Sequence, residues 1–359
     1  MFQDIHCLED IPVPNSLQPT VFIQNALVRL SSDECIEKFC SNIINNDNYK
    51  DPRIMAKLAQ EIVTLSQIRH NRFDIIVKLC KKLFSDIDFY MNLRNRILER
   101  IFIESSYYLL LLLYRANLYD QSEILDQIYL YQRCDFAIYF APEFGLLEIT
   151  SFRPPRWVRK ILKHIDVFRA NDWELLKEYR EIGWMPGSIY ATVKSDDIEK
   201  LITFMQNYDF NLNYYIEASK FESFRIPRVT TFISFAAIFG AIKCFKLFYN
   251  LGAEITQSVM QCAIAGGCYE IIRICSREIL ANFDAAIEYR RHDVMDWLLQ
   301  NMICNVNSTI CLDWNNILAA LYVSDSNEKN ELIVNGLSEI SKGLAISLSD
   351  IFISSSIPT

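Results

Sequence analysis

The amino-acid sequence predicts an all-α protein in which a helical N-terminal domain precedes a short, irregular array of helix pairs. Three observations favour this fold class. The 359 residues include only 9 glycines and 10 prolines, which is too few for many tight hairpins. Apolar residues recur at helical spacing through most of the chain. A helix–turn–helix pattern also returns several times between residues 184 and 310, and a chain that repeats a helix pair builds a stacked array.

Composition is typical of a globular chain and narrows the class of partner. Hydrophobic residues make up 51% and charged residues 22% of the sequence, so the chain has enough apolar material for a packed core. The net charge of −8 disfavours attraction to a nucleic-acid backbone, and we expect no nucleic-acid partner. The most apolar run, at 107–114, is far shorter than the roughly 20 residues that cross a bilayer, so we expect no membrane insertion.

The cysteine pattern predicts a reducing compartment. The chain has 11 cysteines, an odd number, and they follow no regular spacing. Cys244, Cys262 and Cys275 stand at apolar positions of expected helices, where free cysteine behaves as a small buried hydrophobe. The first ten residues show no basic segment followed by an apolar core, as a signal peptide would. These features predict a cytoplasmic protein.

The N-terminal part reads as an irregular lead-in over residues 1–20 and a helical domain over 21–150. Three prolines interrupt the lead-in. Two helix starts are marked: Ser31 and Ser32 are good N-cap residues, and Pro52 suits the first position of a helix. Between residues 20 and 140 we expect five or six antiparallel helices.

Prolines mark the boundary between the two halves. Pro142 is followed by Pro154 and Pro155, and residues 151–183 are predicted to form a linker and a helix that ends near Gly183. The repeats then occupy 184–310. Residues 311–359 lose the pattern, and they form either a degenerate capping region or a loosely ordered tail.

The turns inside the helix pairs are the clearest repeated feature. We expect a left-handed residue in each turn, because glycine favours that conformation and Asp and His tolerate it better than most side chains. The four positions that we treat as equivalent are Asp196, Gly240, Gly267 and His292. The apolar faces of the second helices, including Phe245, Ile272 and Trp297, should then meet in one continuous core.

Several segments give the repeats a family resemblance. The turn Ala-Ala-Ile-Phe-Gly at 236–240 and the exit Asn-Leu-Gly-Ala-Glu-Ile-Thr at 250–256 resemble the ankyrin repeat. More specifically, residues 170–307 look like the divergent ankyrin-type repeats of a large protist (trichomonad-type) family, in which a helical N-terminal domain of unknown function precedes the repeats. The other matching pieces are Asn-Asp-Trp-Glu-Leu at 171–175, Lys-Ser-Asp-Asp-Ile at 194–198, Ala-Ile-Ala-Gly-Gly at 263–267 and Arg-His-Asp-Val-Met-Asp-Trp at 291–297. The resemblance implies an ankyrin-like α-solenoid that binds another protein.

The sequence departs from ordinary ankyrin repeats in two ways. The Thr-Pro-Leu-His opening of standard repeats is absent. The turn positions are also unevenly spaced, whereas ankyrin repeats return about every 33 residues. The interval from Asp196 to Gly240 must carry an insertion, around 214–228, and the two later intervals are short. We therefore expect an irregular array in which some hairpins are incomplete.

No motif predicts catalysis or a cofactor. The glycines never reach the spacing of a phosphate-binding loop, and no closely paired Cys and His ligands are present. Cys262, Cys268 and Cys275 form the closest cysteine cluster, and packing in the core explains them. We predict no catalytic residue, no cofactor, no metal and no small-molecule substrate.

Two basic clusters are candidates for contact with a partner. Arg153, Arg156, Arg159 and Lys160 surround Trp157 after the double proline, with Lys163 one turn further on. This cluster is either a solvated helix face or a docking patch for an acidic peptide or a phosphate group. The second cluster consists of Arg290, Arg291 and His292, which we expect to be exposed at the turn of the fourth repeat.

The leading hypothesis is a non-enzymatic protein–protein interaction module with an unidentified protein partner. Two alternatives remain. The N-terminal helices could make the chain an adaptor that recruits a larger complex. The chain could also be a hydrolase with a cleft between the helical halves, and such an enzyme needs a cysteine or histidine beside a carboxylate.

Overall fold

The structure, a computed structural model, is all-α in the residues that it describes, as the sequence predicts. These residues are 13, 17–69, 71–85, 87–147, 153–207, 211–227, 230–279, 283–301, 311, 316, 317 and 319–321. Within them, β-type pairing is limited to one isolated bridge between Tyr215 and Thr231. None of the helices in this part of the chain combines the length and the apolar character that crossing a membrane requires.

The N-terminal half has more helices than the five or six predicted. They are α1 (Gln18–Arg29), α2 (Asp33–Asn45), the 3-10 helix η2 (Asp47–Lys50), α3 (Pro52–Ile68), α4 (Phe73–Leu83), α5 (Ile87–Glu104), α6 (Tyr107–Arg115), α7 (Gln121–Leu130), α8 (Cys134–Tyr139) and α9 (Ala141–Phe144). The two marked starts are confirmed, because the side chain of Ser32 accepts from the backbone N–H of Cys35 and that of Asp51 from the backbone N–H of Arg53. Helix α1 begins three residues inside the expected lead-in.

The remaining helices follow the double proline. They are α10 (Arg156–Lys163), α11 (Ile165–Ile182), α12 (Ile189–Lys194), α13 (Ile198–Asn207), α14 (Phe232–Ile238), α15 (Ile242–Asn250), α16 (Gln257–Gly266), α17 (Tyr269–Cys275), α18 (Asp284–Glu288) and α19 (His292–Asn301). Helix α11 ends where predicted, at left-handed Gly183.

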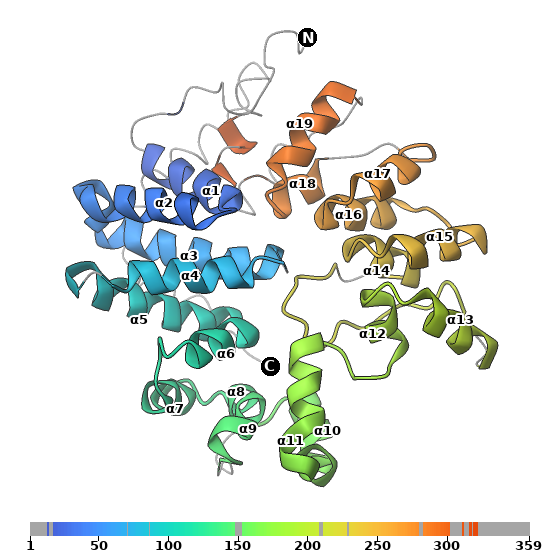
Figure 1. The fold of residues 1–359 in the computed structure, drawn as a ribbon, viewed down its shortest axis with the longest axis horizontal. Helices are drawn as coiled ribbons and strands as arrows, with labels where there is room; N and C mark the ends of the chain where they lie inside the picture. Colours follow the sequence, from blue (N-terminus) through green and yellow to red (C-terminus); the bar gives the residue numbers. More distant parts are fainter. Residues whose placement is uncertain are drawn as a thin grey trace.

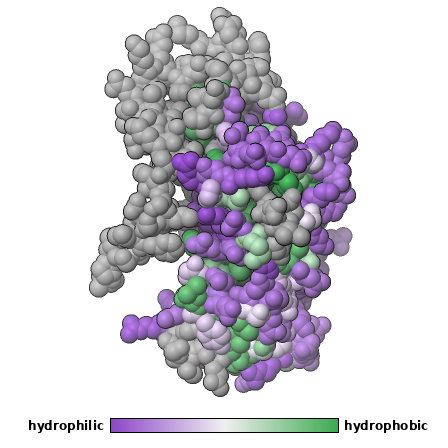
Figure 2. Space-filling view, turned by 90° about the vertical axis from the view of Figure 1, so that its left-hand side faces the viewer, coloured by the Kyte–Doolittle hydropathy of each residue, from purple (hydrophilic) through white to green (hydrophobic). Residues whose placement is uncertain are grey.

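Alternate helices stack on one another in both halves (Figure 1). Helices α1, α3 and α5 form one layer of the N-terminal half, and α2, α4 and α6 form a second layer. In the C-terminal half α12, α14, α16 and α18 form one layer, while α13, α15 and α17 form the other. Figure 2 shows the outer side of the N-terminal half, where hydrophilic residues cover most of the described surface and hydrophobic residues appear in scattered patches. The apolar helix faces therefore point mainly into the stack.

The turns within the C-terminal helix pairs share one conformation, with one correction to the predicted register. Asp196, Gly240 and Gly267 have positive φ angles of 55°, 66° and 73°, as expected. In the fourth pair the left-handed residue is Arg290, at φ 49°, and the prediction of His292 is wrong by two residues. In all four turns the next helix begins two residues after the left-handed one, so His292 is the first residue of α19.

Three of these turns, at Asp196, Gly240 and Arg290, share one pair of hydrogen bonds, whereas in the turn at Gly267 the N–H of that glycine donates to the carbonyls of Ala263 and Ile264. At Gly240 the backbone N–H of Ala241 donates to the carbonyl of Ala236 at 2.9 Å, and the N–H of Gly240 donates to the carbonyl of Ala237 at 3.2 Å. This pair of bonds is the Schellman motif, which satisfies the last carbonyls of a helix and needs a left-handed residue after it.

The same turn also occurs in the N-terminal half, where the sequence analysis did not find it. Ser105 and Gln132 are left-handed, and α6 and α8 begin two residues after them. The N–H groups of the following residues donate back to Ile101 and Ile128 at 3.0 Å. Because a left-handed conformation costs a non-glycine residue about 1–2 kcal/mol, glycine is the usual marker of this turn. No glycine marks it here.

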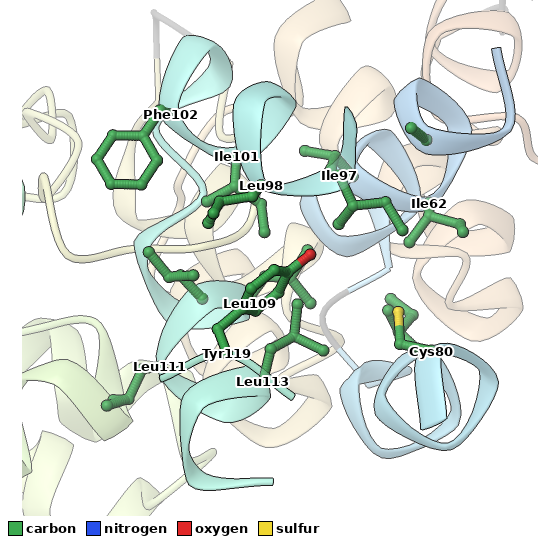
Figure 3. Packing of buried hydrophobic residues seen from close by; sticks show 14 of the residues in the cluster. Ile62, Cys80, Ile97, Leu98, Ile101, Phe102, Leu109, Leu111, Leu113 and Tyr119 are labelled. Atoms are coloured by element: carbon green, nitrogen blue, oxygen red, sulfur yellow. The ribbon is translucent and has the colours of Figure 1, made fainter. Parts of the chain in front are cut away.

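Buried apolar side chains form two clusters that divide near Gly183. The first is built from residues of α1–α11; Figure 3 shows Ile62 of α3, Cys80 of α4, Ile97 of α5 and Leu109 of α6 meeting in it. The second cluster lies among α12–α19. It contains Phe245 and Ile272, with Trp297 packed against it, so the expectation of one shared core for these three residues is confirmed.

The two halves exchange core residues, and the chain closes on itself. Leu17, Val21 and Ile68 come from the N-terminal half but belong to the C-terminal cluster. Phe221 lies in the segment 211–227, where the insertion was predicted, and belongs to the N-terminal cluster. In Figure 1 this segment lies between the two stacks, and α18 lies near α1.

Little of the C-terminal region lies within the described residues. Cys311, Asn316, Ile317 and residues 319–321 are buried. The backbone N–H of Ile317 donates to the side-chain oxygen of Gln24 in α1 at 3.2 Å. These residues add to the contact between the two ends of the stack. The choice between a capping region and a loose tail for the rest of 311–359 lies outside the described residues, as does the predicted lead-in apart from residues 13 and 17–20.

Candidate interaction surface

Helix α10 is fixed to the body of the protein by one apolar face. Val158 and Ile161 are buried, and the helix packs against α8 and α11. Trp157 is half-buried, with its ring 5.8 Å from that of Phe221 and 6.4 Å from that of Tyr107. Full burial of one such aliphatic side chain is worth about 1.5–3 kcal/mol, so this short helix is held by its contacts.

The opposite face of α10 carries four of the five cations of the first predicted cluster, and the fifth, Arg153, precedes the helix. The members of the cluster are all exposed: Arg153, Arg156, Arg159, Lys160 and Lys163. None of the five forms an ion pair within the part of the chain that the structure describes. The structure therefore brings the predicted residues together as one basic surface, which we call the α10 surface.

The α10 surface does not help the helix to form. Arg156 and Lys160 are four residues apart, as are Arg159 and Lys163, and each such like-charge pair costs about 0.2–0.5 kcal/mol. Arg156 also occupies the first turn, which contains no acidic residue, where a positive charge opposes the helix dipole by about 0.3–1 kcal/mol. Only the two lysines in the last turn are well placed. The concentration of positive charge is thus not explained by helix stability.

A strained turn that no sequence pattern predicts follows the α10 surface. Inside α11, Asn171, Asp172 and Trp173 have φ angles of 51°, 55° and 63°, so three successive residues are left-handed. Burial of Trp173 holds the turn, and the guanidinium of Arg169 lies 5.8 Å from the centre of its ring. A conformation this costly persists only where surrounding contacts impose it, and such turns cluster at functional sites. Asn and Asp adopt the left-handed conformation more readily than most residues, whereas a Trp at such a position gives no sequence signal for the turn.

The second predicted cluster is not exposed, which corrects the expectation. Arg290 and His292 are buried, and Arg291 is half-buried. Arg290 forms an ion pair with Glu61 of α3. Arg291 donates from Nε to the carbonyl of Ala265 at 3.0 Å, near the C-terminus of α16. These side chains contact other parts of the same chain, because the turn that carries them faces α3 and α16.

Glu61 is the centre of a buried polar joint between the two ends of the stack. Lys57 Nζ lies 2.8 Å from its carboxylate, and Gln24 Nε2 donates to it at 2.9 Å. On the other side, Arg69 Nη2 donates to the backbone carbonyl of Arg290 at 3.0 Å. Burial lowers the pKa of Arg290 to about 10 and that of Arg69 to about 9. Both remain charged at neutral pH, so the carboxylate of Glu61 faces the charged guanidinium of Arg290, whereas burial holds the pKa of Lys57 well below its usual value.

His292 borders the same joint. Its Nε2 lies 3.4 Å from the side-chain oxygen of Asn316, and its Nδ1 has no hydrogen-bond partner. Burial lowers its pKa to about 4, and the nearby arginines act in the same direction. The imidazole is therefore neutral at physiological pH.

A polar cleft of about 180 Å³ lies between the halves, where the alternative hydrolase would have its active site. Gln67 and Arg225 lie on its walls and are joined by a hydrogen bond of 2.7 Å. Glu104 also lines it, and burial raises the pKa of that carboxyl. The described lining contains neither a cysteine nor a histidine. The pairing that the hydrolase hypothesis requires is not found in this cleft.

The cysteines pack as predicted. Cys262 and Cys275 are buried, and burial raises the pKa of each thiol to about 12. Cys268 is half-buried. The described residues contain no group of three or more His, Cys, Asp or Glu side chains that could hold a metal ion.

Comparison with protein families finds a match over part of the chain. Residues 250–323 match the family described as a domain of unknown function (DUF3447), a domain found in ankyrin-repeat-containing proteins. The matched stretch begins at the last residue of α15 and covers α16–α19. Comparison with curated proteins and with solved structures returned no match.

Proposed function

We propose that this chain is a non-enzymatic protein–protein interaction module. In this proposal α12–α19 are a divergent ankyrin-type array, and the α10 surface is where a partner protein binds. The match of residues 250–323 to a domain of ankyrin-repeat-containing proteins supports the first part. Ankyrin arrays commonly bind other proteins through exposed side chains on a rigid stack of helices.

One observation carries the choice of surface. The exposed cations of the α10 surface make no ion pair in the described chain, although the whole protein has a net charge of −8. In the other predicted cluster, Arg290 and Arg291 already form contacts within the chain. The α10 surface is thus the candidate that stays available to another molecule.

We also propose that the protein acts in the cytosol. Nine cysteines are free within the described residues, and seven of these are buried. A chain with many unpaired thiols suits a reducing compartment.

Charge reversal on the α10 surface tests the proposed function. The protein would be purified with its partners from the cells that express it, as wild type, as Arg156→Glu/Arg159→Glu and as Lys81→Glu/Lys243→Glu. The control pair makes the same change in charge at exposed lysines of α4 and α15. We expect the first variant to lose partner proteins that the control retains. Identical partner sets for all three proteins would contradict the proposal.

A further inference from the structure

The cations of the α10 surface form a row. Arg156 is three and four residues from Arg159 and Lys160, and these two are four and three residues from Lys163, so all four lie on one side of a helix of 8 residues, which is roughly 12 Å long. Arg153 is also exposed and lies three residues before the helix in the chain. A site for one phosphate brings its donors together around a point. A row of this kind instead matches a series of negative charges at similar intervals.

The surroundings disfavour a nucleic acid. Proteins that bind single strands combine positive charge with aromatic side chains on which bases stack. Trp157 is the aromatic residue of this helix, and its half-buried ring packs against Tyr107 and Phe221. The net charge of −8 also opposes a polyanion that extends beyond the row.

We propose that the α10 surface binds an acidic segment of a partner protein, with carboxylates spaced so that they face successive cations of the row. This inference rests on the proposed function and names the chemistry of the partner. An acidic helix with carboxylates at every third or fourth residue has the required spacing. The uncapped N-terminus of α10, where Pro155 has no side chain that could cap it, adds backbone N–H groups for a further carboxylate.

Peptide binding to the full chain tests this chemistry. A fluorescent helical peptide with glutamates at every fourth position would be titrated by anisotropy, beside the same peptide with glutamines in their place. A single-stranded RNA of similar length and vesicles that contain an inositol phospholipid serve as the other two arms. We expect the glutamate peptide to bind and the glutamine peptide to bind at least about tenfold more weakly.

The variants connect that binding to the surface. Arg156→Glu/Arg159→Glu should weaken binding of the glutamate peptide by about tenfold or more. Lys81→Glu/Lys243→Glu should leave the affinity for this peptide within about twofold of the wild-type value. The milder variant Arg156→Gln/Arg159→Gln keeps the result readable if the double reversal perturbs folding, and its effect should be about half as large on a logarithmic scale. Raising the salt from about 50 to about 500 mM should weaken binding several-fold, because these charges are exposed.

Three outcomes would overturn the inference: no binding of the glutamate peptide, tighter binding of the RNA or the vesicles than of that peptide, or peptide binding that both α10 variants leave unchanged. The proposed function fails separately. If charge reversal abolishes capture of partner proteins while no acidic peptide binds, the surface is right and its chemistry is wrong. If charge reversal changes neither the capture of partner proteins nor the binding of the peptide, both proposals fail.

Discussion

Arg290 and Glu61 form a buried ion pair, which joins the pair of helices α18 and α19 to helix α3 of the N-terminal half. Their side chains are 6% and 0% exposed, so the pair is shielded from water. Buried ion pairs add little net stability compared with apolar residues of the same shape, but loss of one partner leaves an uncompensated charge in the interior. The pair therefore favours one arrangement of the two ends.

A double-mutant cycle measures this coupling. Glu61→Gln should lower the free energy of unfolding by about 3–5 kcal/mol, since it leaves the charge of Arg290 buried without a counter-charge. Arg290→Met should cost less, because Lys57 and Gln24 still contact the carboxylate of Glu61. The double variant should lose clearly less than the sum of the two. Chemical denaturation of the four proteins gives the values. Additive losses would mean that the two side chains do not interact.

The buried histidine makes stability depend on pH. The pKa of His292 is about 4 in the folded chain, against an ordinary value of 6.5. The unfolded chain therefore binds this proton more readily, so stability is complete above pH 6.5 and falls as the pH drops towards 4. The gap corresponds to a loss of about 3 kcal/mol.

The variant His292→Gln isolates this effect, because all carboxylates are shared with the wild type. Between pH 7 and 4 its unfolding free energy should fall less steeply than that of the wild type. Parallel pH profiles for the two proteins would show that the histidine is not buried in a neutral state.

The segment 211–227 connects the two halves through Phe221. Phe221 is buried, and its ring centroid lies 4.3 Å from that of Tyr179 and 5.4 Å from that of Tyr139. Phe221→Ala should cost about 3–5 kcal/mol, as is usual for a buried phenylalanine. Lys220→Ala is the matched control, because the neighbouring lysine is exposed. A loss below about 1 kcal/mol for Phe221→Ala would show that the segment is a loose loop.

Glycine should have opposite effects on stability at two left-handed positions: introducing it at one should stabilise the protein, and removing it from the other should destabilise the protein. Gln132 is exposed and left-handed, so Gln132→Gly should stabilise the protein by about 0.5–1 kcal/mol. Gly240→Ala should destabilise it by about 1 kcal/mol through its backbone conformation, because an added methyl group would meet only Cys268 Cβ at an ordinary 3.8 Å. Thermal unfolding of both variants checks the signs. A destabilising Gln132→Gly would contradict the equivalence of the two turns.

Local signals were sufficient for much of the fold. Capping residues such as Ser32 and Asp51 locate helix starts, because their side chains satisfy free N–H groups at those ends. Gly240 and Gly267 locate turns because glycine tolerates the left-handed conformation that commonly follows the end of a helix. Where Ser105 or Gln132 takes the same role, the composition carries no signal, and the helices of the N-terminal half are undercounted.

Long-range contacts explain the rest of the difference. The sequence around Arg290 reads as an exposed turn, since charged residues normally face solvent. Its burial depends on Glu61 and Arg69, which approach only when the two ends of the stack meet. The spacing of apolar residues within the repeats does not predict this contact between the two ends of the stack. The cations around Arg156, by contrast, are exposed on a local helix, so the sequence was sufficient to place them on one surface.

The most direct test of the account is site-specific crosslinking from the α10 surface in living cells. A photo-reactive amino acid would replace Lys160 in one protein and Lys81 in another, and mass spectrometry would identify the attached peptides. We predict that the probe at position 160 captures an acidic segment of a partner protein that the probe at position 81 does not. Capture of the same proteins from both positions, or of none from position 160, would contradict the account.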